Sequence, residues 1–216
     1  MTTLPLTPDE LLTATRTVRK RLDLTRPVPL PLIRECLEIA LQAPSGSNRQ
    51  GWEWLVITDP AQRAAVSAFY QRSCQEYLDA AGPAGNLDAG DPERTAVQRR
   101  IVESTRYLSD HMAEVPVLVI PCIRAGVRAL GAGNQAGLWS SILPAAWSYM
   151  LAARSRGLGT AWTTLHLKFE ADVAEVLGLP AGIAQAGLIP TAYYTGETFK
   201  PAARTPLDEV LHLDRW

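Results

Sequence analysis

The strand-forming segments of this chain are few and short, and they do not alternate regularly with the helical segments. Apolar runs at 52–58, 115–122 and 186–194 predict strands, whereas the apolar spacing at 29–43 and 138–156 predicts longer helices. A doubly wound parallel sheet needs a helix after nearly every strand. The pattern therefore predicts an α+β fold.

Local signals mark the boundaries of other helices. The sequence TPDE at 7–10 is a capping box, which predicts a helix to about residue 15. The pair DP at 59–60 begins a helix to about residue 78, and further helical patterns lead to 112 and cover 171–177. The segment at 82–93 is rich in glycine and proline and is expected to be a loop.

Length and composition limit the classes of protein to consider. At 216 residues the chain is predicted to form one domain over 1–216, with an excursion at about 79–112. It is 47% hydrophobic and 20% charged with a net charge of -1, so neither nucleic acid nor a membrane is expected as a partner. We expect neither a signal peptide nor a transmembrane helix, and the three cysteines are too widely spaced for a disulfide framework or a CxxC pair. A soluble cytoplasmic protein is predicted.

Two polar segments are candidate binding sites. In APSGSNRQGWEW (43–54), seven small or polar residues separate a helix from a strand, although such connections need only about 2 to 6 residues. The run RTVRKR (16–21) contains four cations. It is either the solvated end of a helix or an anion site in which guanidinium groups and the Thr17 hydroxyl bracket a phosphate.

Several familiar sites are not supported. GAGNQAG (131–137) lacks the spacing of a dinucleotide fingerprint, and no acidic residue follows it within 30 positions. The three histidines do not have metal-ligand spacing, and Cys122 is expected to lie in the core. Without an acid, base and nucleophile set, we expect the chemistry to belong to a bound cofactor. No catalytic residue and no metal ligand is assigned.

Four blocks, in the right order over nearly the whole chain, resemble the FMN-dependent nitroreductase family. RTVRKRLD (16–23) resembles its R-[ST]-x-R-x-[FL] motif, and APSGSNRQGWEWLVITDP (43–60) resembles its A-P-S-x-x-N-x-Q-P-W block, with Gly51 in place of proline. GLGTAWTT (157–164) resembles G-L-G-[TS], and RTPLDEVLHLDRW (204–216) resembles the closing block. Residues 79–112 carry no motif of the family.

The resemblance implies a central mixed, mostly antiparallel sheet flanked by helices, in an intertwined homodimer with two FMN at its interface. The implied phosphate ligands are Arg16, Thr17 and Arg204. Arg19 would lie near flavin N1 and O2 or join Arg16 at the phosphate, and the neighbouring Val18 is a further implied FMN contact. The other implied FMN contacts are Pro44, Ser45, Gly46 and Asn48 from the partner chain, backbone groups of Thr163, Thr164 and Leu165 at N5 and O4, and Ile142, Leu143 and Pro144 at the dimethylbenzene end.

The resemblance also implies a reaction. NADH or NADPH would donate hydride to the flavin and leave, and an electron-poor small molecule such as a nitroaromatic compound or a quinone would then be reduced in a ping-pong sequence. The rival hypothesis is an FMN-binding storage or sensor protein without turnover. Residues 79–112 are either a lid that selects the acceptor or a surface insertion. Further candidates for the pocket wall are Tyr70, Tyr77 and His166.

Overall fold

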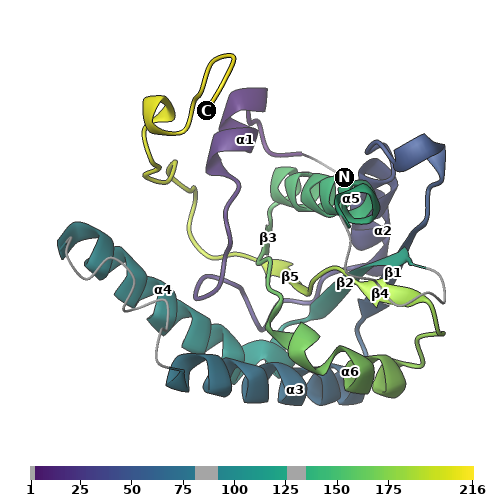
Figure 1. Cartoon of the computed structure of the whole chain (residues 1–216). Coiled ribbons are helices and arrows are strands. Elements are labelled where there is room, and N and C mark those ends of the chain that lie inside the picture. The colour runs from purple at the N-terminus through teal and green to yellow at the C-terminus, as the bar shows by residue number, and fades with distance from the viewer. Residues whose placement is uncertain (1–2, 81–91, 126–134) are drawn as a thin grey trace.

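The computed structural model describes residues 3–80, 92–125 and 135–216, and its centre is a five-stranded sheet (Figure 1). The strand order is β1-β2-β5-β3, and β4 also pairs with β2. The strands are β1 (Trp52–Ile57), β2 (Val117–Arg124), β3 (Leu158–Thr160), β4 (Ile183–Gln185) and β5 (Ile189–Tyr193). All four ladders are antiparallel. Within the described residues, parallel pairing is confined to one bridge, between Thr17 and Thr160.

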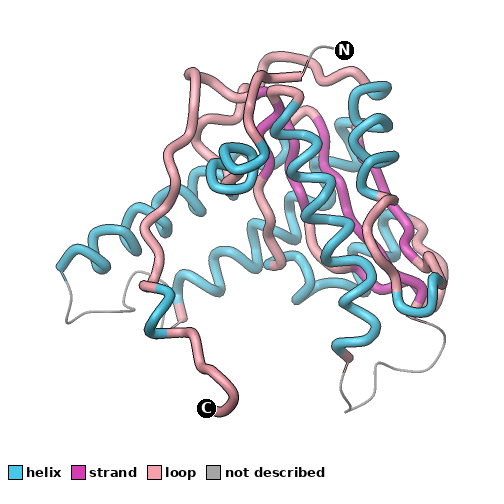
Figure 2. Tube along the Cα trace, turned by 90° about the horizontal axis from the view of Figure 1, so that it is seen from above, coloured by secondary structure: helices cyan, strands magenta, loops and turns pink. Residues whose placement is uncertain are grey.

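Helices cover both faces of this sheet, which confirms the predicted α+β class. The α-helices of the described residues are α1 (Pro8–Ala14), α2 (Leu30–Ala40), α3 (Pro60–Asp79), α4 (Pro92–His111), α5 (Ala136–Ser155) and α6 (Glu170–Leu177). Figures 1 and 2 show α2 and α5 on one face and α3 and α6 on the other. Helix α4 packs against α3.

The apolar run at the centre of β2 explains why helices must cover both faces of the sheet. Leu118, Val119 and Ile120 are all fully buried. Because neighbouring residues of a strand point to opposite faces, Val119 joins the cluster formed with α2 and α5, and Leu118 and Ile120 join the cluster formed with α3. A central strand buried on both sides reads as a continuous apolar run without polar alternation.

Helix boundaries follow the local signals in the sequence. The Glu10 amide donates to the Thr7 hydroxyl at 3.2 Å, and the Thr7 amide donates to the Glu10 carboxylate at 2.8 Å, so the predicted capping box is present. Asp59 caps α3 by accepting from the Gln62 amide at 2.9 Å. These contacts span three residues and are therefore visible in the sequence.

The strand predicted at 186–194 is wrong in its extent, because β5 covers only Ile189–Tyr193, and residues 183–185, just before the predicted strand, form the separate strand β4. β4 pairs with residues 122–124 of β2, and β5 pairs with residues 117–119. Between them, Leu188 pairs with Thr163 instead. A Cβ on Gly187 would lie 3.2 Å from the Trp162 indole nitrogen, so a larger residue would crowd this close approach.

The chain leaves the sheet after β5 as a tail, residues 195–216. Its one helical element is a 3₁₀ turn at Leu207–Glu209. The large apolar side chains exposed along it are Leu207, Val210, Leu211, Leu213 and Trp216. In the part of the chain that the structure describes, no helix has both the length and the apolar character to cross a bilayer.

Candidate functional site

The basic run at 16–21 does not form a helix end. α1 stops at Ala14, and the chain then runs beside β3, where the Val18 amide donates to the Thr160 carbonyl at 2.8 Å. The Val18 side chain is buried, whereas Arg16 and Thr17 are exposed. The first sequence interpretation, a solvated helix end, is therefore wrong. Residues 16–18 of the run lie beside β3, and the chain then turns at 19–21, where the Leu22 amide donates to the Arg19 carbonyl at 3.1 Å.

Gly159, in the block GLGTAWTT, allows this contact. A Cβ at that position would lie 3.1 Å from Val18 Cγ1 and 3.2 Å from Leu22 Cδ2. A larger residue would push the basic run away from β3. Two motif blocks that lie about 140 positions apart in the sequence thus meet at one close contact.

Arg19 is a partly buried cation at a small cavity. The cavity, of about 190 Å³, is lined by residues 17–21 with Ser104 and Phe199. The Arg19 guanidinium donates to the Ser104 hydroxyl at 3.3 Å, and that hydroxyl donates to the Ile101 carbonyl at 2.9 Å. Burial lowers the pKa of Arg19, and no carboxylate among the described residues forms an ion pair with it. A desolvated cation with unused donors favours an anionic ligand.

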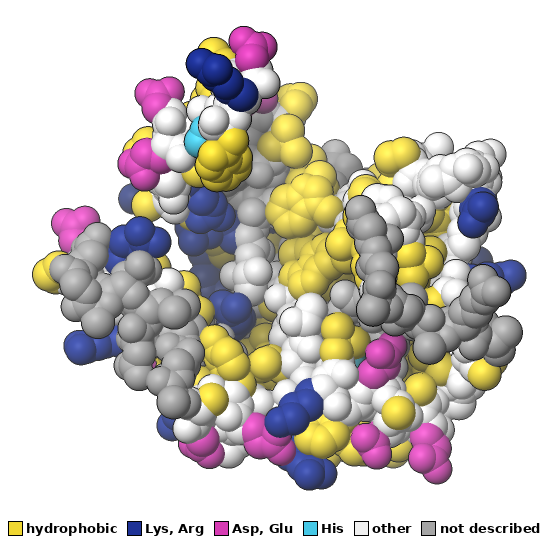
Figure 3. All heavy atoms as spheres, viewed as in Figure 1, with side chains coloured by type: hydrophobic (Ala, Val, Ile, Leu, Met, Phe, Trp, Pro, Cys, Tyr) yellow, Lys and Arg dark blue, Asp and Glu magenta, His cyan; other side chains and the backbone are white. Residues whose placement is uncertain are grey.

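The other two arginines of the predicted phosphate site lie nearer the surface. Arg16 donates to the Lys200 carbonyl at 3.0 Å, which brings the tail to the basic run. Arg204 donates to the Ala203 carbonyl at 3.0 Å and lines a separate cavity of about 450 Å³ between α4 and the tail. Figure 3 shows lysine and arginine side chains gathered in the hollow beside the tail.

The loop at 44–48 is docked on α5. The Gly46 amide donates to the Ser141 hydroxyl at 3.0 Å. Within the loop, Ser45 accepts from the Gln50 amide at 3.1 Å, and Asn48 accepts from the Gln50 side chain at 2.9 Å. These bonds fix a segment whose side chains are mostly exposed.

The backbone of this loop is strained. Ser47, Asn48 and Gln50 have φ angles of 53°, 52° and 49°, in the left-handed region that favours glycine. Each such residue costs about 1 to 3 kcal/mol, and such strain is typical of binding loops. Figures 1 and 2 place the loop and the basic run on opposite sides of α5. One chain therefore presents two polar segments that face different directions.

The block that contains Thr163, Thr164 and Leu165 is only partly available to a ligand. The Thr163 amide and carbonyl both bond to Leu188, at 3.0 and 2.8 Å, so these backbone groups are not free to meet a flavin. The Thr163 hydroxyl donates to Tyr70 at 3.2 Å. In the described part of the chain, the amides of Thr164 and Leu165 donate no hydrogen bond.

The three predicted contacts on α5 differ in exposure. Ile142 is fully buried in a cluster with Ile123, Ala184 and Ala186. Leu143 is 37% exposed, and Pro144 lies half-buried inside the helix. The side chain of Leu143 is thus the most accessible of the three.

Two of the candidates for the pocket wall are buried. Tyr70 is 1% exposed, and burial raises its pKa to about 12. His166 is fully buried, neither ring nitrogen has a hydrogen-bond partner, and burial lowers its pKa to about 4. Tyr77 remains 39% exposed. Only Tyr77 therefore presents a large surface to solvent.

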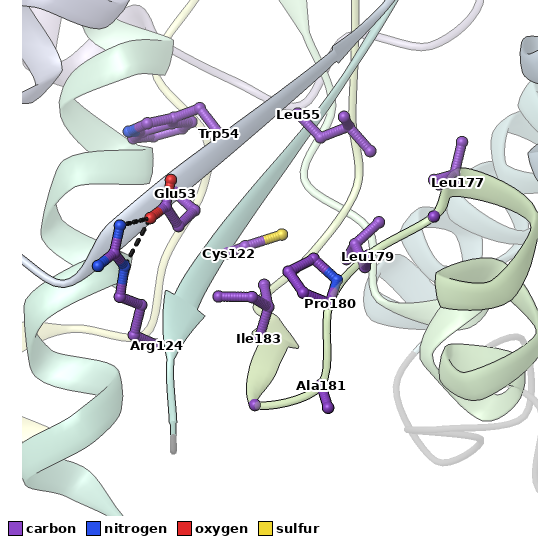
Figure 4. Close-up of a pocket in the computed structure, with 12 residues that line it drawn as sticks. Glu53, Trp54, Leu55, Cys122, Arg124, Leu177, Leu179, Pro180, Ala181 and Ile183 are labelled. Carbon is purple, nitrogen blue, oxygen red and sulfur yellow. Dashed lines mark hydrogen bonds and ion pairs between the residues drawn. The ribbon is translucent and has the colours of Figure 1, made fainter. Parts of the chain in front are cut away.

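A larger cavity, of about 640 Å³, lies away from all of these residues (Figure 4). It is bounded by β1, the end of β2 and residues 177–183, and Arg124 donates to the Glu53 carboxylate at 2.6 Å on its rim. Burial raises the pKa of Cys122, on its wall, to about 12, so the thiol stays protonated and is no nucleophile. The described residues contain no cluster of metal-ligating side chains.

Comparison with known protein families agrees with the order of the four motif blocks in the sequence. The sequence model of the nitroreductase family matches residues 12–193, which is most of the chain. The chain belongs to the nitroreductase family. Members of this family are flavin oxidoreductases that take electrons from NAD(P)H, and this chain is therefore an enzyme of that type.

Individual relatives within the nitroreductase family are distant. The chain is 28% identical over 200 residues to a Thermus thermophilus protein described as NADH dehydrogenase, covering 86% of each chain. It is 29% identical over 194 residues to a Nocardioides 4-nitrobenzoate reductase, covering 80% of this chain and 74% of the relative. Iodotyrosine deiodinase bound to FMN and 3-iodo-L-tyrosine has the same fold, with a TM-score of 0.72, 18% identity and coverage of 96% and 99%.

The sequence analysis did not identify two serines that hold the candidate binding segments in place. Ser104 of α4 binds Arg19, and Ser141 of α5 holds the loop at 44–48. Their partners lie 85 and 95 positions away, so no local pattern identifies them. Residues 92–111 of the suggested lid form α4, whereas residues 81–91 lie outside the described residues.

Proposed function

We propose that this nitroreductase holds FMN and uses NAD(P)H to reduce an electron-poor aromatic compound or quinone. The observation that carries the proposal is Arg19, a partly buried cation with unused donors beside a cavity. The relatives support it: one is described as NADH dehydrogenase, one as a reductase of 4-nitrobenzoate, and the deiodinase structure holds FMN.

The residues present suit FMN. When bound, FMN would supply the redox chemistry, the transfer of electrons from NAD(P)H to an electron-poor acceptor. Arg16, Thr17 and Arg204 would neutralise and hold the phosphate. Arg19 would bind the N1 and O2 edge, and the amides of Thr164 and Leu165 would face the N5 and O4 edge. These groups bind and orient, and none needs to act as a nucleophile.

The placement of the polar segments supports a homodimer. The basic run and the loop at 44–48 lie on opposite sides of α5, so a flavin held by one chain's run meets the loop of a second copy. The exposed apolar side chains of the tail give a second reason, because a partner surface would cover them. Each FMN site is then built from two chains.

We further propose that residues 79–112 select the acceptor. α4 contacts the basic run twice, through Ser104 with Arg19 and through Glu103 with Lys20 at 2.9 Å. A helix attached to the cation site is placed to form one wall for the acceptor. If a glycine-serine linker in place of 82–91 leaves both FMN binding and the relative kcat/KM for quinones and nitroaromatics unchanged, this role is excluded.

An anaerobic reduction experiment tests the function. The protein loaded with FMN is mixed with NADH, and separately with NADPH, while the visible absorbance of the flavin is followed. Rapid bleaching with either donor, followed by return of the colour when a quinone is added, is the expected result. A bound flavin that neither donor reduces would indicate a storage or sensor protein, and a chain that takes up no FMN would contradict both functions.

A further inference from the structure

We propose that Arg21 is a positioning residue that fixes the start of the tail and thereby directs Arg204 towards the bound FMN. This inference rests on the proposed function and on the role of Arg204 within it. Arg21 lies in the basic run, but its contacts differ from those of Arg16 and Arg19, because two of its donors are already used by the tail.

The Arg21 guanidinium binds two carbonyls of the tail. Nε donates to Thr195 at 2.6 Å, and Nη1 donates to Thr198 at 3.0 Å. The backbone adds a third bond, from the Thr195 amide to the Arg21 carbonyl at 2.9 Å. With the Arg16 bond to Lys200, the tail carbonyls at 195, 198 and 200 are all held by the basic run. Hydrogen bonds from a charged donor are stronger than neutral ones.

Aromatic rings add further contacts around the Arg21 guanidinium. The Arg21 guanidinium carbon lies 4.1 Å from the centre of the Phe199 ring, and the Phe199 and Tyr194 rings are 4.8 Å apart. From the other side, Arg154 of α5 donates to the Tyr194 hydroxyl at 2.6 Å and lies 5.0 Å from the Phe199 ring. A planar guanidinium can stack and donate at once, which an ammonium cannot.

Gly196 leaves space for the Arg21 side chain. It has a φ of +80°, and a Cβ there would lie 2.7 Å from Arg21 Nη2. The tail therefore turns around the guanidinium at a position where glycine provides both the backbone angle and the space. Arg204 follows eight residues later in a stretch without regular structure, so its place depends on where this turn directs the chain.

The test is a double-mutant cycle on the FMN dissociation constant, measured by flavin fluorescence. Arg204→Ala is expected to raise the constant roughly tenfold to a hundredfold, the loss of one interaction with a charged group. Arg21→Ala is expected to raise it several-fold in the wild-type background. In the Arg204→Ala background it is expected to add less than about twofold, because residues that act through one contact are not additive. Arg21→Lys, which keeps the charge, is expected not to restore affinity.

Arg26→Ala is the matched control. Arg26 stacks on Tyr193 at 3.5 Å, so the variant removes the same charge and a similar stack while leaving the tail contacts intact. Its FMN affinity is expected to stay at the wild-type value. Hydrogen exchange of the FMN-free chain gives an independent result: the segment 194–204 should exchange faster in Arg21→Ala and not in Arg26→Ala.

The outcomes separate this inference from the proposed function. Wild-type FMN affinity in Arg21→Ala, losses that multiply in the double variant, or full rescue by lysine would overturn the role of Arg21 alone. Unchanged affinity in Arg204→Ala would overturn the role of Arg204 and this inference with it. A wild-type chain that takes up no FMN would overturn the proposed function as well.

Discussion

In the proposed site, Arg19 is the side chain expected to influence the redox properties of the flavin most directly. A fixed cation beside N1 and O2 stabilises the reduced flavin, which carries more negative charge there. Arg19→Ala is therefore expected to shift the midpoint potential negative by tens of millivolts, since about 30 mV corresponds to 1.4 kcal/mol for two electrons. An anaerobic titration against a reference dye measures the shift.

The neighbouring residue provides the control for this prediction. Lys20 is exposed and paired with Glu103, so Lys20→Ala removes a charge but is expected to leave the potential unchanged. If Arg19→Ala weakens FMN binding without shifting the potential, Arg19 belongs to the phosphate site. Normal binding together with an unshifted potential would contradict both positions.

The buried side chain of His166 is expected to make the free energy of unfolding depend on pH. Burial lowers its pKa to about 4, below the ordinary value of 6.5, so the unfolded chain binds a proton more readily than the folded one. Stability is therefore complete above about pH 6.5 and falls as the pH decreases towards 4. Between pH 7.5 and 5 this side chain is expected to account for about 2 kcal/mol of lost stability.

Urea unfolding of His166→Gln at the two pH values measures this contribution. The variant cannot take up the proton, so its free energy of unfolding is expected to change less with pH than that of the wild type. Equal slopes in the wild type and the variant would refute the assignment.

The residues of the site were predictable to different degrees for a physical reason. Arg16, Arg19 and Arg204 stand in blocks whose spacing is visible in the sequence. The backbone bonds of Thr163 to Leu188, and the burial of Ile142, depend on how distant segments pack. The sequence therefore indicates which segments are candidates for the site, but not which of their atoms remain available to bind a ligand.

Among the secondary-structure elements, the loop at 44–48 depends on α5. Ser141→Ala removes the acceptor of the Gly46 amide, and the loop already stores backbone strain, so it is expected to relax. The rate of FMN release should then increase several-fold. Stopped-flow recovery of flavin fluorescence measures this rate.

Ser140→Ala is the matched control for this element. Ser140 is the preceding residue of α5, but it is exposed and bonds only to the Gly137 carbonyl in its own helix. Its removal is expected to leave FMN release unchanged. Equal release rates in the two serine variants would show that the docking bond does not support the binding loop.

Helices were predicted more reliably than strands because their signals are local. The caps at Thr7 and Asp59 act over three residues, and both helices begin where the sequence indicates. The predicted strand at 186–194 begins three residues too early, because Gly187 instead passes close to Trp162, a contact between separate segments. Strand limits follow from pairing partners, which the sequence of one segment does not contain.

At the scale of the whole molecule, the account requires a flavin site shared by two chains. In the proposed homodimer each chain would contribute a basic run to one site and a loop at 44–48 to the other, so damage to either segment would remove both sites. Arg16→Ala with Arg204→Ala impairs the side of the proposed site formed by the basic run and the tail, and Ser45→Ala with Asn48→Ala impairs the side formed by the loop. Light scattering on the wild type is expected to give a dimer.

Mixing these two impaired proteins tests the shared site most directly. After dissociation and reassociation at equal amounts, half of the dimers are mixed, and each mixed dimer has one intact site, so about a quarter of all sites should be restored. The quantity measured is the amount of protein-bound FMN, per mole of chain, that NADH or NADPH bleaches anaerobically. Recovery of about a quarter of the wild-type signal is predicted; a mixture that recovers none, while each parent still forms dimers, would contradict a flavin site built from two chains.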